Sequence, residues 1–255
     1  MDQLERVKRE FARQADTFAA SAAITDEQLT SRLVEAFGSA AGGTILDVAC
    51  GPGIVTAALA RRAREVVAFD LTPEMLKKAE QRCARAGLTN VKFRQGSAAD
   101  LPFADAAFDG VVTRLAVHHF SEPRRVFNEM FRVLRVGGTL VVADVVSSED
   151  AEEAALQNAI EMLRDPSHVR MLPSSELLSA LETAGFAIEA QATWDKSREF
   201  EEWMGIANDP ERVAPLRVVA AALARAGEQA GMGLSLANGK VVFFRRWHMM
   251  VARKP

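Results

Sequence analysis

The segment Ile45-Leu46-Asp47-Val48-Ala49-Cys50-Gly51-Pro52-Gly53 decides the fold of this chain. A short apolar run ends at an acidic residue, a tight Gly-Pro-Gly turn follows, and residues 54–63 have the composition of a helix. Glycine has no Cβ, so it permits positive φ angles and lets the backbone come close to a ligand. The N–H groups at the start of the helix can bind an anionic group. This order of strand, glycine loop and helix is typical of nucleotide-binding α/β folds.

Short β-branched runs alternate with helical stretches along the next hundred residues. The runs are Thr44–Val48, Glu65–Phe69, Val91–Gln95, Gly110–Thr113 and Thr139–Val145. Strands that alternate with helices predict a parallel sheet with right-handed crossovers. Capping signals support the helices: Thr72-Pro73 begins one that Gly87 ends, and another begins at Ser121 and ends at Gly137-Gly138.

The two ends of the chain have a different pattern. Residues 1–40 have the apolar spacing of amphipathic helix, and residues after about 150 are mainly helical. The later helices are expected at Glu152–Arg164, Ser174–Ala184 and over much of Glu199–Gly227, with strands at Phe186–Thr193 and Val241–Ala252. A glycine turn leads into the last strand, which favours an antiparallel orientation. We interpret residues 1–255 as one domain, with a helical lid at 1–40, a core at 41–150, and a helical insertion with the last strands at 151–255.

The composition excludes several classes of protein. The net charge of −3 argues against a nucleic-acid partner bound through its phosphates. No apolar run approaches the roughly 20 residues of a membrane helix, and the N-terminus lacks the apolar core of a secretion signal. The two cysteines do not make a disulfide framework, and the four histidines have no metal-ligand spacing with them. We therefore expect a cytoplasmic protein without a membrane span, a bound metal or a nucleic-acid partner.

Acidic residues follow two neighbouring strands. Asp47 ends the first, and Asp70 ends the second, where a carboxylate can accept both hydroxyls of a ribose. Thr56 stands where a dinucleotide fingerprint has its third glycine. An acid aimed at the loop suits a ligand with a cationic group better than a pyrophosphate. Two further turns, at 96–103 and 114–120, follow strands at the same edge of the sheet.

Taken together, these motifs resemble class I S-adenosylmethionine-dependent methyltransferases, closest to the ubiquinone and menaquinone biosynthesis group with a type 11 methyltransferase domain. The matching stretches are Leu46–Gly53, Phe69–Leu76, Leu101-Pro102-Phe103 with Phe108-Asp109, and Val133–Gly138. The resemblance is strong over about residues 35–145. It implies an α/β, Rossmann-like, doubly wound and mostly parallel seven-stranded sheet with an antiparallel last strand, covered by helical lids from the N-terminus and the C-terminal half.

The resemblance also implies which residues bind S-adenosylmethionine. Asp70 would bind the ribose, Leu71 and Ala98 would flank the adenine, and Ser97 stands where the family often has an acid facing the adenine amino group. Asp47 would hold the ammonium group through its neighbours. The implied set is Asp47, Ala49, Gly51, Gly53, Asp70, Leu71, Ser97, Ala98, Arg114 and Leu115, of which the two glycines face the methionine part and the last two border the methionine tail and the methyl group.

Candidates for catalysis are less distinct. His118 and His119 follow the fourth strand, and one of them, with a slight preference for His119, could be a general base; local packing is the alternative. His168 and Arg170 could touch the substrate from a loop. Four apolar residues either line an acceptor pocket or, as we favour, form core: Trp194, Phe200, Trp203 and Met204. Phe11 and Phe18 could cap such a pocket. We interpret Cys50 as a small residue that fills space in a tight loop, and His248 as a structural residue.

The sequence therefore predicts an enzyme that transfers a methyl group in line from S-adenosylmethionine to a small-molecule acceptor, with S-adenosylhomocysteine as product. An apolar or aromatic acceptor would suit the aromatic residues. Three alternatives stay open: a noncatalytic domain that binds the same cofactor, a methyltransferase acting on a small protein or RNA, and a nicotinamide oxidoreductase, which the threonine at position 56 disfavours. The acceptor atom and the oligomeric state cannot be read from the sequence.

Overall fold

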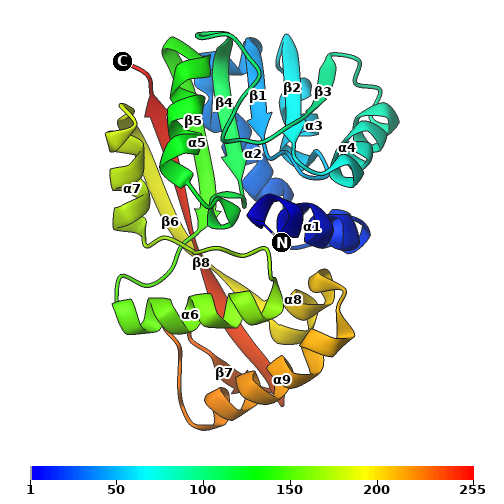
Figure 1. Ribbon diagram of the computed structural model, residues 1–255, viewed down its shortest axis with the longest axis vertical. Helices are drawn as coiled ribbons and strands as arrows, with labels where there is room; N and C mark the ends of the chain where they lie inside the picture. The colour runs from blue at the N-terminus through cyan, green and yellow to red at the C-terminus, as the bar shows by residue number, and fades with distance from the viewer. Residues whose placement is uncertain (1) are drawn as a thin grey trace.

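A twisted eight-stranded sheet runs the length of the molecule in the computed structural model, which describes residues 2–255 (Figure 1). The strands are β1 (Thr44–Val48), β2 (Glu65–Asp70), β3 (Val91–Gln95), β4 (Phe108–Arg114), β5 (Leu134–Val145), β6 (Ala187–Glu199), β7 (Ser235–Ala237) and β8 (Lys240–Arg253). Their order is β3-β2-β1-β4-β5-β8-β6, and β7 pairs with β8 off this path. The first five strands are parallel, while β8 runs antiparallel to both β5 and β6. The predicted fold class is confirmed: the main path has the expected seven strands with an antiparallel last strand, and the short β7 is an eighth strand that was not expected.

Helices cover both faces of the sheet. They are α1 (Gln3–Ala20), α2 (Glu27–Ala36), α3 (Ile54–Ala60), α4 (Pro73–Arg85), α5 (Pro123–Val133), α6 (Ala151–Arg164), α7 (Ser174–Thr183), α8 (Phe200–Ala207) and α9 (Pro210–Arg225). Leu33 of α2 and Leu59 of α3 pack into the core on one face. Phe127 of α5 and Leu181 of α7 pack into the core on the other. These four helices thus bury apolar side chains against the two faces, as a doubly wound sheet requires.

Two stretches expected to be largely continuous helix are divided. Residues 1–40 form α1 and α2, because the Asp26 carboxylate accepts the Leu29 N–H and begins a second helix. Residues 199–227 form α8 and α9, because Asn208 takes a left-handed φ of 51° and Asp209 then caps α9. Two strands are longer than predicted. The strand expected at Thr139–Val145 is β5, which begins at Leu134, and the strand expected at Phe186–Thr193 is β6, which continues to Glu199 along β8.

The outer halves of β6 and β8 extend past the parallel strands and carry a third apolar cluster. Phe200, Trp203 and Met204 of α8 pack there with residues of α9 and β8; α8 and α9 lie in the lower part of Figure 1. The favoured interpretation of these three as core fits this placement, and Trp194 stacks on Trp247 with 6.0 Å between ring centroids. Helix α1 lies between this lobe and the parallel strands, in contact with α4 and α8. Among the helices of residues 2–255, none is long and apolar enough to cross a membrane.

Candidate functional site

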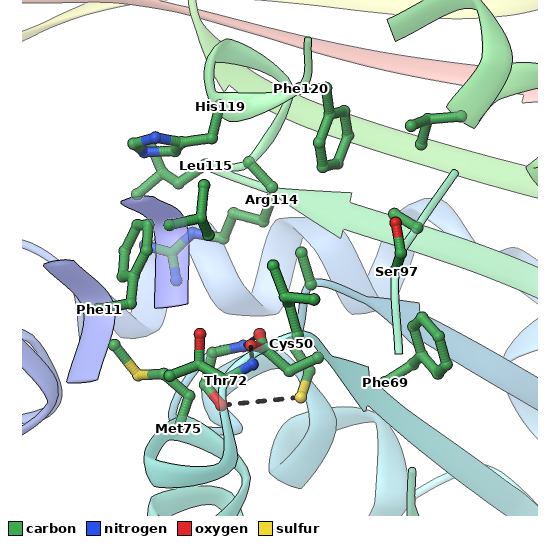
Figure 2. A pocket seen from close by; sticks show the side chains of 18 of the residues that line it. Phe11, Cys50, Phe69, Thr72, Met75, Ser97, Arg114, Leu115, His119 and Phe120 are labelled. Carbon is green, nitrogen blue, oxygen red and sulfur yellow. Dashed lines mark hydrogen bonds between the residues drawn. The ribbon is translucent and has the colours of Figure 1, made fainter. Parts of the chain in front are cut away.

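A cavity of about 1100 Å³ opens at the carboxyl ends of β1, β2 and β4 and is covered by α1. Most of the cofactor set predicted from the sequence lies in its wall: Asp47, Ala49, Gly51, Asp70, Leu71, Ser97, Ala98, Arg114 and Leu115. Gly53 is absent from the wall. Figure 2 shows Ser97 and Phe69 on one side of this cavity, and His119 and Phe11 on the other.

The loop after β1 turns sharply because three of its residues have positive φ: Ala49 at 56°, Gly51 at 53° and Gly53 at 74°. Gly53 is needed for packing, since a Cβ there would lie 2.7 Å from the Cβ of Ala79 on α4. Gly51 has open space around its Cα instead, and its N–H points to the carboxylate of Asp70. The loop therefore presents backbone to the cavity at Gly51 and packs against a helix at Gly53.

Asp70 is held by the backbone at the end of β2. Its Oδ2 accepts the Gly51 N–H at 2.8 Å, and its Oδ1 accepts the Thr72 N–H at 2.8 Å. The residue is only 8% exposed, and burial raises the pKa of its carboxyl group. An ionised carboxylate has about four acceptor positions, so each oxygen can accept a further hydrogen bond from a ligand in the cavity.

Asp47 is buried more deeply, at 2% exposure, and its Oδ2 accepts the Thr56 hydroxyl at 2.5 Å. Burial raises the pKa of Asp47 to about 7. Arg114 faces the same cavity; its Nη2 donates to the Ile24 carbonyl at 2.7 Å and its guanidinium lies 5.7 Å from the Trp247 ring centroid. Thr56, which the sequence showed only as a missing glycine, is the partner of Asp47.

The turn after β3 forms the far side of the cavity. A Cβ on Gly96 would lie 2.5 Å from the Phe69 ring, so only glycine lets this turn rest on the ring without rearrangement. Ser97 Oγ accepts the Ala99 N–H at 3.3 Å, which orients the hydroxyl locally.

Cys50 is buried in the glycine loop, and burial raises the pKa of its thiol well above the usual value. A thiolate role for Cys50 is therefore disfavoured.

The two candidate bases have different surroundings. His118 Nδ1 lies 2.6 Å from Asp144 Oδ1, and the other oxygen of Asp144 accepts the N–H groups of Ala116 and Val117. His119 Nδ1 lies 3.1 Å from the Ser167 carbonyl, and its ring meets Phe11 edge-on. Burial lowers the pKa of His119 to about 4. His119 lines the large cavity, whereas His118 lines a smaller one next to it.

Phe11 and Phe18 line the large cavity, whereas His168, Arg170 and His248 lie outside it. His168 Nε2 bonds to Asn158 Oδ1 at 2.8 Å, Arg170 forms a surface ion pair with Glu176, and His248 bonds to Gln191. Sequence reasoning missed Asp144, although it carries the same signal as Asp47: an acid at the end of an apolar strand. Within residues 2–255, no group of histidine, cysteine and acidic side chains is arranged to hold a metal ion.

Comparison with known proteins places this geometry among methyltransferases. A family model described as a methyltransferase domain matches residues 46–142. A solved Bacillus halodurans protein, described as a candidate methyltransferase, is 33% identical with a TM-score of 0.82, and the alignment covers 89% of this chain and 98% of that one. The Bacillus subtilis methyltransferase YcgJ is 33% identical over 63% of each chain. A demethylmenaquinone methyltransferase of Clavibacter sepedonicus is 40% identical over 41% of this chain and 42% of its own length.

Proposed function

Because this chain belongs to the class I S-adenosylmethionine-dependent methyltransferases, we propose that it methylates a small-molecule acceptor and releases S-adenosylhomocysteine. The observation that carries the proposal is the cavity in which Asp47 and Asp70, at the ends of adjacent parallel strands, flank a glycine loop. The name of the demethylmenaquinone relative supports a small-molecule acceptor. The net charge of −3 argues against a nucleic-acid partner bound through its phosphates.

In this proposal Asp70 binds the ribose. Its two oxygens are fixed by backbone N–H groups, and each retains room for one hydroxyl donor. Leu71 and Ala98 would flank the adenine, with Ser97 as a hydrogen-bonding group at its edge. Gly51, whose N–H donates to the Asp70 carboxylate, has open space where a Cβ would stand, which supports placing the ribose there.

The methionine part would lie along the glycine loop. Ala49 and Gly51 would face it, while Gly53 would act indirectly by letting the loop pack on α4. Asp47 would attract the ammonium group in its ionised form, oriented by the Thr56 hydroxyl. Arg114 and Leu115 would border the methionine tail and the methyl group, respectively.

A bound sulfonium supplies an already activated methyl group, so the residues of this chain mainly have to align the acceptor and exclude water. Helix α1 is suited to both tasks. Leu4, Val7 and Phe11 line the cavity from this helix, and Gln3 ties its start to the carbonyls of His119 and Ser167. We assign α1, together with the helices after residue 150, as the lid of a single domain.

Where the acceptor must lose a proton, we assign His118 as the base. A carboxylate oxygen 2.6 Å from Nδ1 holds the ring in one orientation and leaves Nε2 as the nitrogen that can face the acceptor. His119 is the weaker candidate, because a group with a pKa of about 4 holds a transferred proton poorly. Asp144 would be a positioning residue that acts through His118.

A radiolabel experiment tests the proposal. Purified protein is incubated with methyl-tritiated S-adenosylmethionine and, in separate samples, a metabolite extract, a protein extract and total RNA, and label in each sample is counted after the donor is removed. We expect label transfer together with calorimetric binding of S-adenosylhomocysteine. Binding without transfer to small molecules, proteins or RNA would indicate a noncatalytic domain. Label found only in protein or only in RNA would mean that the acceptor is that macromolecule and not a small molecule.

We further propose a cytoplasmic location, which agrees with unpaired buried thiols at Cys50 and Cys83.

A further inference from the structure

A second cavity, of about 620 Å³, adjoins the cofactor cavity. The two share five wall residues: Phe11, Phe18, Ile24, Leu115 and His119. The second cavity lies among α1, α6, α8 and the outer parts of β6 and β8, and it meets the cofactor cavity at Leu115, the residue proposed to border the methyl group. A molecule in this cavity could reach the shared wall without displacing the cofactor.

Three largely buried arginines line the second cavity: Arg164 from α6, Arg198 from β6 and Arg245 from β8. Their side chains are 11%, 10% and 10% exposed. Burying a guanidinium costs free energy unless an anion compensates it. The cost is visible at Arg164, where burial lowers the pKa to about 10.

The same wall holds two acidic residues, Glu161 and Asp165, and Glu202, the partner of Arg198, lies outside the lining. Glu161 is shared, because it pairs with Arg245 and lies 3.5 Å from Arg164. Asp165 is already engaged: one oxygen accepts the Ser167 N–H and hydroxyl, and the other faces Gln14. The two remaining titratable groups of the wall are His118 and His119.

Arg198 has the most exposed carboxylate partner of the three. Glu202 lies at the rim with a side chain that is 43% exposed, and its Oε2 lies 2.8 Å from Arg198 Nη2 and accepts the Nε–H at 2.9 Å. An exposed partner can turn toward water at little cost, because surface ion pairs contribute little free energy. The guanidinium of Arg198 is therefore available to a ligand.

We infer that this cavity binds an oxyanion group, carboxylate or phosphate, of the methyl acceptor, with Arg198 as the main contact and Arg164 as the second. The inference rests on the proposed methyl transfer. Arginine suits such groups because its planar fork can donate two parallel hydrogen bonds. The apolar body of the acceptor would lie against Phe11, Phe18 and Trp247, and its reacting atom would reach the shared wall at Leu115, close to His118. The acceptor is accordingly a small amphiphilic acid.

The test divides a metabolite extract by anion exchange at pH 7 and assays both fractions with methyl-tritiated S-adenosylmethionine. We expect label only in the retained, anionic fraction. Treating that fraction with phosphatase, or esterifying its carboxylic acids, then identifies which oxyanion the acceptor carries by which treatment abolishes labelling. Label confined to the unretained fraction would overturn the inference and leave methyl transfer standing, whereas no label in either fraction would overturn both.

Variants provide the second arm, with the active fraction as probe. Arg198→Gln should raise the acceptor KM about 10- to 100-fold, the usual effect of losing a charged hydrogen bond, with little change in kcat or in affinity for S-adenosylhomocysteine. Arg198→Lys should recover part of the loss. Arg246→Gln is the matched control, because Arg246 is exposed on β8 and pairs with Asp195. An unchanged acceptor KM in Arg198→Gln would contradict the inference; if that variant unfolds, the fractionation and Arg198→Lys still decide it.

Discussion

The cofactor half, residues 44–145, and the lobe after residue 150 build their cavities in different ways. In the first, Asp47 and Asp70 each lie at the carboxyl end of a strand, and their partners Thr56 and Gly51 lie within twenty residues. In the second, Arg164, Arg198 and Arg245 come from three separate elements and meet only through packing. A ligand bound by strand ends and backbone turns leaves a local sequence pattern, and a ligand bound by scattered side chains leaves none.

Asp70→Ala should give the largest effect and sharpen the comparison on the cofactor side. The change removes both acceptors for the ribose hydroxyls and leaves the N–H groups of Gly51 and Thr72 unsatisfied. We expect affinity for S-adenosylhomocysteine to fall about 100-fold or more, since each charged hydrogen bond contributes about 1.5–3 kcal/mol. Calorimetry measures it, with the exposed Asp100→Ala as control. An Asp70→Ala protein that binds as tightly as the wild type would disprove the ribose assignment.

Acid should destabilise the lobe through His168. Burial lowers the pKa of His168 to about 2, so the unfolded chain binds a proton below about pH 6.5 that the native chain does not. Stability contributed by this group is complete above pH 6.5 and falls as the pH decreases toward 2, by about 2 kcal/mol between pH 6.5 and 5.0. Urea unfolding of wild type and His168→Gln at both pH values should give a flatter dependence for the variant. The prediction would be refuted if the unfolding free energy of wild type and His168→Gln changed equally between the two pH values. It would also be refuted if the surface control Arg170→Gln showed the same flattening as His168→Gln.

The raised pKa of Asp47 predicts that cofactor affinity depends on pH. With a pKa of about 7, this carboxyl group is largely protonated at pH 6 and ionised at pH 8. Only the ionised form attracts the ligand ammonium, so affinity for S-adenosylhomocysteine should increase about tenfold over that range. Titrations of Asp47→Asn should show no such increase. A pH-dependent affinity that survives in this variant would place the titrating group elsewhere.

The smallest effect expected concerns the start of α6, which carries Arg164. Asp150 caps this helix, because its Oδ1 accepts the N–H groups of Glu152 and Glu153 at 3.0 Å. Asp150→Ala should lower the free energy of unfolding by about 1 kcal/mol without changing affinity for S-adenosylhomocysteine. Asp150→Ser, which keeps a capping oxygen, should lose less. A fall in cofactor affinity in Asp150→Ala would mean that the two halves are coupled.

What could be predicted from the sequence follows the same division. The parallel strands were predictable because buried β-branched runs end at acids and glycines, and the family resemblance carried by those strand ends implied the cofactor set. The break at Asp26 and the left-handed turn at Asn208 were missed, because one capping side chain in an otherwise helical composition decides each. The arginine cavity could not be predicted, since nothing local relates Arg198 to Arg164.

The central claim is that the two cavities divide the binding of donor and acceptor between them. Titrating S-adenosylhomocysteine into wild type, Asp70→Ala and Arg198→Gln under identical conditions tests it most directly. We predict that the wild type and Arg198→Gln bind with the same affinity, while Asp70→Ala binds about 100-fold more weakly or not measurably. Equal affinity in Asp70→Ala and wild type, or a loss in Arg198→Gln as large as that in Asp70→Ala, would contradict the claim.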